Sequence, residues 1–73
     1  MAKKIPISNT IKTLRFLNDE MTQQDLAEQL GLTRQTIAAI EQRKYSPSLE
    51  VAFKIALIFE KSLEEVFTFE GDN

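Results

Sequence analysis

Residues 22–41, TQQDLAEQLGLTRQTIAAIE, decide the fold of this chain. They contain two short amphipathic patterns, one on each side of Gly31. Helices that cross at about 90–120° across a short turn need a small residue where their backbones meet and a residue that tolerates positive φ at the bend. Ala27 and Gly31 meet these two needs. Thr22 and Thr33 can each accept a hydrogen bond from a free amide of a following first turn. The stretch therefore predicts two helices joined by a sharp turn.

Outward from this stretch, the same periodicity predicts five helices, over residues 9–18, 23–30, 34–42, 49–59 and 63–67. Pro47 interrupts any continuous helix between the third and the fourth, and Ser62 with Glu65 forms a capping-box sequence before the fifth. The end segments KKIPI (residues 3–7) and FTFEG (residues 67–71) alternate apolar and polar residues, so a short two-stranded sheet is expected between them. Pro6 limits the first of these strands to an edge. The predicted fold is one all-α domain over residues 1–73, with this sheet added.

The composition narrows the classes of protein to consider. Of 73 residues, 42% are hydrophobic, and neither cysteine nor histidine is present. Disulfides and the usual zinc sites are therefore excluded, and a domain this small needs close helix packing or self-association for stability. No apolar run approaches the length of a membrane span, and the first residues lack the apolar core of a secretory signal. We expect a cytoplasmic protein with no cofactor.

Charge is unevenly distributed along the chain. The formal net charge is −2, which argues against indiscriminate binding to a polyanion. However, residues 60–73 carry a net charge of −4 and residues 1–59 carry +2. Basic side chains at positions 34, 43 and 44 cluster after the sharp turn. A nucleic-acid surface on that side remains compatible with the composition.

Several motifs together resemble the lambda-repressor-like (Cro/Xre) helix-turn-helix family, especially its short single-domain subgroup. They are the pair Leu14 and Arg15, the stretch over residues 22–41, YSPSLEVAFKIA beginning at Tyr45, and LEEVF near the end. The match covers residues 11–67 and is specific as a set. The resemblance implies a five-helix DNA-binding domain with its helix-turn-helix over residues 23–42. It also implies that residues 34–42 form a recognition helix, which enters the major groove of double-stranded DNA.

The resemblance assigns base reading to the first turn of that helix. Arginine can pair bidentately with guanine and glutamine with adenine, so the chemistry of Arg34 and Gln35 fits this role. Thr36 can meet a phosphate or a thymine methyl, and Ala39 is a further candidate contact. An ordinary solvated helix face is the alternative for these residues, and it is nearly as well supported for Thr36.

Backbone contacts and an internal ion pair follow from the same resemblance. The candidate phosphate contacts lie at the start of the second helix and in the loop after the third, and they are Thr22, Gln23, Arg43, Lys44, Tyr45 and Ser46. Capping alone would also explain Thr22. Arg15 and Glu41 resemble the family's internal ion pair, which ties the first helix to the end of the recognition helix.

The fourth predicted helix is apolar on almost all sides. One face can pack in the core, so the other apolar face is expected to be buried against a second surface. We expect a two-fold dimer patch within the C-terminal region 57–70, made of Leu57, Ile58, Val66, Phe67 and Phe69. The alternative is that Leu57 is a scattered exposed leucine, which needs no explanation.

Three classes of function remain open at this point. The leading one is a sequence-specific DNA-binding transcriptional regulator that acts as a homodimer on an inverted repeat. An antitoxin-like or adaptor module would use the same helices against a protein, and steep salt dependence would distinguish DNA binding from it. An enzyme is disfavoured because histidine and cysteine are missing and Glu64 and Glu65, as sequence neighbours, point to different sides of a helix. No small-molecule ligand or membrane partner is indicated.

Overall fold

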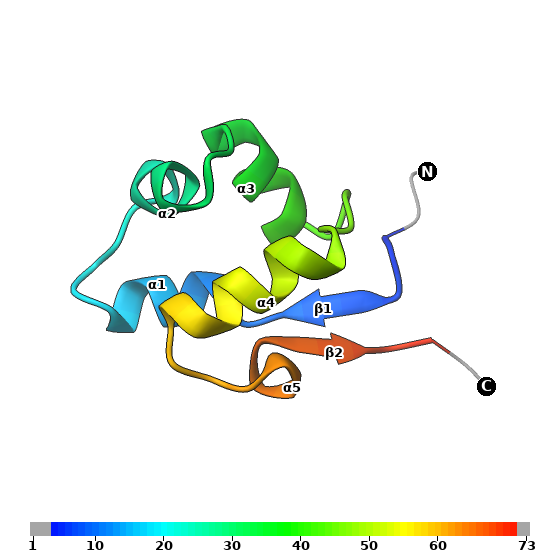
Figure 1. The fold of residues 1–73 in the computed structure, drawn as a ribbon. Coiled ribbons are helices and arrows are strands. Elements are labelled where there is room, and N and C mark those ends of the chain that lie inside the picture. Colours follow the sequence, from blue (N-terminus) through cyan, green and yellow to red (C-terminus); the bar gives the residue numbers. More distant parts are fainter. Residues whose placement is uncertain (1–3, 72–73) are drawn as a thin grey trace.

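The structure is a computed structural model and describes residues 4–71, arranged as five helices and one two-stranded sheet (Figure 1). In chain order the elements are β1 (Ile7–Asn9), α1 (Ile11–Leu17), α2 (Gln23–Leu30), α3 (Arg34–Glu41), α4 (Leu49–Ile58), α5 (Leu63–Val66) and β2 (Phe67–Phe69). Figure 1 places α2 and α3 at one end of the molecule and α5 with the sheet at the other, with α4 between them. The expected all-α fold with a small sheet is confirmed.

The turn between α2 and α3 forms as the sequence predicts. Gly31 ends α2 in the left-handed conformation, with φ of 70°. Ala27 is completely buried where the two helices meet. Thr22 and Thr33 accept hydrogen bonds from the backbone amides of Asp25 and Thr36, so each helix begins with a side-chain cap.

Each of the five helices contributes at least one side chain to the core. Its largest fully buried members are aliphatic and come from α1, α2, α3, α4 and α5, and they are Ile11, Leu26, Ile37, Ile40, Ile55 and Val66. Ala52 and Ala56 complete the buried face of α4, and Phe59 is buried directly after the helix. Within residues 4–71, no helix is both long enough and apolar enough to cross a membrane.

The N-terminal boundary differs from the sequence prediction. α1 begins at Ile11 and not at residue 9, because Asn9 belongs to β1 and its side-chain oxygen accepts a hydrogen bond from the Ile11 amide at 3.2 Å. β1 begins after Pro6, whose carbonyl accepts from the amide of Glu70 at 2.6 Å. The predicted strand over residues 3–7 was therefore placed too early, and its Lys3 lies outside the described residues.

The sheet joins the two ends of the described chain. β1 and β2 are antiparallel, with Ile7 opposite Phe69 and Asn9 opposite Phe67. The side chain of Asn9 also donates to the carbonyl of Ile40 at 3.0 Å. Through this bond the first strand supports the C-terminal turn of α3.

Candidate nucleic-acid interface

The first turn of α3 projects free polar side chains from the protein. Arg34 and Gln35 are exposed, whereas Ile37 and Ile40 on the opposite side of the helix are buried. Within the described chain, the side chains of Arg34 and Gln35 make no hydrogen bond or ion pair. Ala39, four residues after Gln35, lies on the same face and is half-buried. This small side chain lets another surface approach the helix closely.

Thr36 is placed less favourably for base reading. It is half-buried, and its hydroxyl lies 3.0 Å from that of Thr33. It lines a small hollow with Tyr45 and Ser48, on the side of α3 that faces the next loop. Contact with a phosphate from that side fits its position better than contact with a base.

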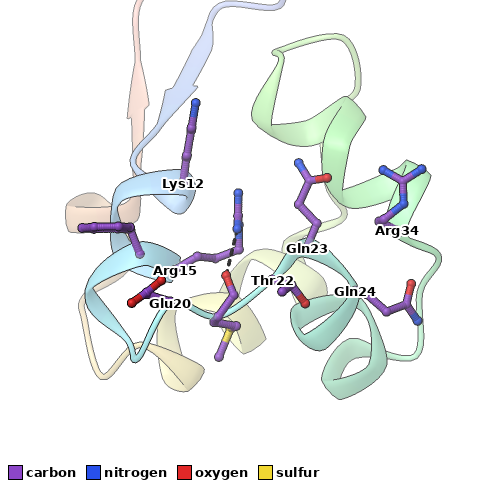
Figure 2. Close-up of a pocket in the computed structure, with 9 residues that line it drawn as sticks. Lys12, Arg15, Glu20, Thr22, Gln23, Gln24 and Arg34 are labelled. Atoms are coloured by element: carbon purple, nitrogen blue, oxygen red, sulfur yellow. Dashed lines mark hydrogen bonds between the residues drawn. The ribbon is translucent and has the colours of Figure 1, made fainter.

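A groove of about 500 Å³ runs beside this turn and brings three helices together (Figure 2). Lys12 of α1, Gln23 of α2 and Arg34 of α3 line it, and Figure 2 shows their nitrogen-bearing ends pointing to the same side. Glu20 also lines the groove, so the lining is not purely basic. The groove combines two cations and an amide donor, which suits a strand of phosphates crossing it.

An ion pair holds the floor of this groove. Arg15 donates from Nε to Oε2 of Glu41 at 2.7 Å and from Nη2 to Oε1 at 3.0 Å. Its Nη1 donates to the Met21 carbonyl at 2.9 Å, which Figure 2 marks with a dashed line. The two side chains are only 13% and 8% exposed. Glu41 is therefore neutralised internally and adds little repulsion toward a polyanion.

The start of α2 is held by a capping box. The Asp25 carboxylate accepts from the Thr22 amide at 3.1 Å, and the Thr22 hydroxyl accepts from the Asp25 amide at 2.9 Å. The hydrogen bond from the Thr22 amide, with that from its side chain, holds the pKa of Asp25 below its ordinary value of 3.8. The amides of Thr22 and Asp25 are thus both occupied, and a carboxylate lies beside the candidate phosphate contact Thr22.

Gln23 remains well placed for the phosphate role. Its Nε2 donates to Oε1 of Glu41 at 3.2 Å, which fixes the side chain at the groove. An amide nitrogen carries two hydrogens, so a second donor remains for a phosphate oxygen.

The loop after α3 contains one half-buried residue, Arg43, followed by three exposed ones. Arg43 takes a left-handed conformation, with φ of 61°, and donates from Nε and Nη2 to the Ile5 carbonyl at 3.2 and 2.8 Å. Its own carbonyl accepts from the Ile5 amide at 3.0 Å. The guanidinium is held by the N-terminal segment, so Arg43 supports the structure of this loop. N–H groups of its side chain remain, and its contact with a phosphate stays a prediction. Lys44, Tyr45 and Ser46 are exposed.

The residues expected in a dimer patch separate into three groups. Val66 is a core side chain with 1% of its surface exposed, so it is unavailable to a partner and its assignment was wrong. Ile58 and Phe67 are half-buried and pack against the core. Leu57 and Phe69 are exposed. The sequence pattern gave no way to separate these groups, because all five residues are apolar.

Two further residues belong to the candidate interface and were missed in the sequence. Lys12 lines the groove, and Gln42 is exposed at the end of α3. Helical spacing would have found Gln42, which lies seven residues after Gln35, whereas Lys12 is brought to the groove by tertiary packing and has no local signal in the sequence.

Comparison with known proteins places this arrangement in a family. The family model described as Helix-turn-helix matches residues 12–66. The uncharacterized HTH-type transcriptional regulator MJ0272 of Methanocaldococcus jannaschii is 50% identical over 66 residues, which are 90% of this chain and 98% of that protein. This chain belongs to the Cro/C1-type helix-turn-helix family.

Two other proteins are also similar to this helix-turn-helix chain. The uncharacterized HTH-type transcriptional regulator YgzD of Bacillus subtilis is 43% identical over 67 residues, which cover 92% of this chain and all of that one. The crystal structure of a "putative DNA-binding protein" from Bacteroides fragilis superposes with a TM-score of 0.73 and 27% identity, covering 85% of this chain and 98% of the other. The relatives thus include archaeal and bacterial members of the helix-turn-helix family.

Proposed function

We propose that this chain is a sequence-specific DNA-binding transcriptional regulator whose α3 enters the major groove. The observation that carries the proposal is the exposed first turn of α3, where Arg34 and Gln35 project without partners in the described chain beside the groove lined by Lys12 and Gln23. Family membership supports it, because the relatives are named as transcriptional regulators. Their archaeal and bacterial origin supports the cytoplasm as the place of action.

In this proposal the residues have separate tasks. Arg34 and Gln35 read bases, and Gln42 and Ala39 lie on the same exposed side of the helix. The phosphate contacts are Lys12, Thr22, Gln23, Thr36, Arg43, Lys44, Tyr45 and Ser46. The chain acts as a homodimer on an inverted repeat, with half-site centres about 34 Å apart, so that two recognition helices enter successive major grooves.

The test is selection of bound sites from a random duplex library with the parent chain and with Arg34→Ala and Gln35→Ala. The parent should return one consensus, and each variant should relax it at one position per half-site. Loss of a good bidentate pair costs about 1–3 kcal/mol of discrimination. If both variants return the parental consensus, the base-reading assignment is wrong.

Gln29→Ala is the matched control for Gln35→Ala. Gln29 is also an exposed helical glutamine, but it lies on α2 and lines a second hollow with Asp19, Asp25 and Glu28, and it is not among the residues that line the candidate groove. Its removal should change neither the consensus nor the affinity.

A protein-interaction adaptor is the second candidate function. The large exposed apolar side chains on α4 favour it, because a surface of this kind often binds protein. An adaptor would return no consensus from the library, and its binding would not weaken steeply with salt.

A further inference from the structure

The outer face of α4 carries an unpaired apolar row. Leu49, Phe53 and Leu57 are 67%, 49% and 75% exposed and lie four residues apart, so they occupy one face of the helix over about 12 Å. We name these three residues the α4 stripe. The opposite face of α4 already supplies Ala52, Ile55 and Ala56 to the core. The stripe is therefore additional to what the monomer needs for its own packing.

The apolar surface continues beyond the helix on one side. A pocket of about 270 Å³ opens next to Leu49, and its lining includes Ala52, Leu63 and Phe67. Leu49 belongs both to the stripe and to the pocket wall, so the two form one continuous surface. A partner that covered the stripe would also cover this pocket.

The other side of the stripe is charged, and its charges have a definite order. Glu50 and Lys54 are both exposed and form an ion pair at 3.1 Å. Each follows a stripe residue by one position, so both lie on the same flank of the helix.

This order makes the surface complementary to itself. When two copies of α4 pack antiparallel about a two-fold axis at Phe53, Leu49 lies opposite the partner's Leu57 and Phe53 meets the partner's Phe53. A two-fold axis perpendicular to both helices keeps the charged flanks on the same side of the pair. Glu50 then lies beside the partner's Lys54, and Lys54 beside the partner's Glu50. The two Lys54 side chains also lie near each other across the axis, so each lysine needs the carboxylates on both sides of it, its own Glu50 and the partner's. A parallel two-fold arrangement would instead place the two charged flanks on opposite sides of the pair, where they make no contact across the interface.

We propose that the α4 stripe is a two-fold self-association surface, whose occupant is α4 of a second copy in antiparallel orientation. The proposal deepens the homodimer of the proposed function, since it names the surface that the two copies share. It replaces the patch expected from the sequence, which included the buried Val66. It concerns the free protein, so it is tested without DNA and stands or fails independently of base reading.

Charge exchange is the sharpest test, because it depends on which residues meet. In sedimentation velocity at tens of micromolar, the parent chain should be a dimer. Glu50→Lys alone and Lys54→Glu alone should each dissociate at least about tenfold more readily, since like charges would face each other twice. A one-to-one mixture of the two variants should form a heterodimer, because every contact between position 50 and the partner's position 54 is again oppositely charged.

A monomeric parent at that concentration would overturn the proposal. So would a mixture that associates no better than its two components. A thermal melt of each variant checks that it is folded, because each reversal also removes the ion pair within its own helix.

A pair of leucine variants tests the apolar part. Leu57→Ser should convert the dimer to monomer, whereas Leu17→Ser should leave the dimer intact. Leu17 is the matched control because it is 72% exposed but lies at the end of α1, outside the stripe. If Leu17→Ser dissociates the dimer and Leu57→Ser does not, the surface lies on α1 and the proposal is wrong.

Discussion

Glu41 joins three helices through its hydrogen bonds. It stands at the end of α3 and accepts hydrogen bonds from Arg15 of α1 and Gln23 of α2. Both carboxylate oxygens are used, and the pair is largely withdrawn from water. Losing one partner would leave a charge with little solvent and no counter-ion, which is much costlier than losing an exposed pair.

We therefore predict that Glu41→Ala lowers the free energy of unfolding by about 3–5 kcal/mol, because Arg15 would be left unpaired. For a domain of this size a loss of 3 kcal/mol corresponds to a fall in Tm of more than about 10 °C. Thermal denaturation followed by circular dichroism measures it.

Glu28→Ala provides the control for this prediction. It removes the exposed hydrogen bond from Gln24 to Glu28, and surface substitutions of this kind usually change stability by no more than about 0.5 kcal/mol. Equal stability losses in the two variants would show that burial of the Arg15–Glu41 pair does not matter.

Residue roles were only partly predictable from sequence. Arg15 and Glu41 could be paired because the family resemblance supplied the partner. Arg43 could not, since its acceptor is the carbonyl of Ile5, 38 residues away, and a backbone carbonyl leaves no signal in the sequence. The exposure of apolar side chains could not be predicted either, because Val66 is apolar like its neighbours and is nevertheless buried in the core.

At the scale of helices, the two capping boxes were the most predictable features. Ser62 and Glu65 at the start of α5 repeat the arrangement of Thr22 and Asp25 at the start of α2. The hydrogen bond from the Ser62 amide, with that from its side chain, lowers the pKa of Glu65 below its ordinary value of 4.5. Both carboxyls are thus more acidic when folded.

The lowered pKa values predict an acid dependence of stability. A carboxyl whose pKa is lower in the folded state stabilises the fold when ionised, and the contribution is lost as pH falls through its folded pKa. Unfolding in urea should therefore become easier below pH 4.5.

The variant Asp25→Asn with Glu65→Gln should show a smaller decline over the same range. The amides keep an acceptor oxygen for the caps but do not titrate. A decline as steep as that of the parent would assign the acid sensitivity to other groups.

The turn between α2 and α3 gives a second prediction at this scale. A Cβ at Gly31 would meet nothing within 4 Å, so only the positive φ opposes a larger residue. We expect Gly31→Ala to cost about 1–2 kcal/mol in chemical denaturation, with Gly31→Asn costing less because asparagine tolerates the left-handed conformation better. A neutral Gly31→Ala would mean that the turn relaxes to another conformation.

Strand β1 illustrates why element boundaries were harder to predict. Residues 8 and 9 fit a helix start by pattern alone. In the folded chain Asn9 has a bond to Ile40 and a place opposite Phe67. These partners are distant in sequence, so local periodicity carried no information about them.

For the whole molecule, acidic and basic side chains are grouped in different places. Glu64, Glu65 and Glu70 lie at the end of α5 and the sheet, and the acidic hollow on α2 lies outside the groove, whereas Lys12, Arg34 and Lys44 lie on the segments of the candidate interface. Figure 1 places α5 at the opposite end from α2 and α3. The net charge of the chain is therefore a poor guide to the surface that faces DNA.

This separation predicts which lysines control salt dependence. Lys12→Ala and Lys44→Ala should each weaken binding to all sequences alike and reduce the slope of log K against log salt by about 1, because each removes one phosphate contact. Lys61→Ala, at the far end, should leave the slope unchanged. Fluorescence anisotropy over a range of salt concentrations measures all three, and an unchanged slope for both Lys12 and Lys44 would exclude them as phosphate contacts.

The pairing of the first strand with the last also determines how the molecule would respond to force. Ile7 lies opposite Phe69 at the outer end of the ribbon, so tension applied to both ends of the chain first loads the bonds of Ile5 to Arg43 and of Glu70 to Pro6, and then the strand pairs one after another. Bonds broken one after another resist less than bonds loaded together, so we expect the ribbon to separate at low force, before the helical body opens. In an optical trap this would appear as a small early extension preceding the main unfolding step, and a single step would mean that ribbon and helices give way as one unit.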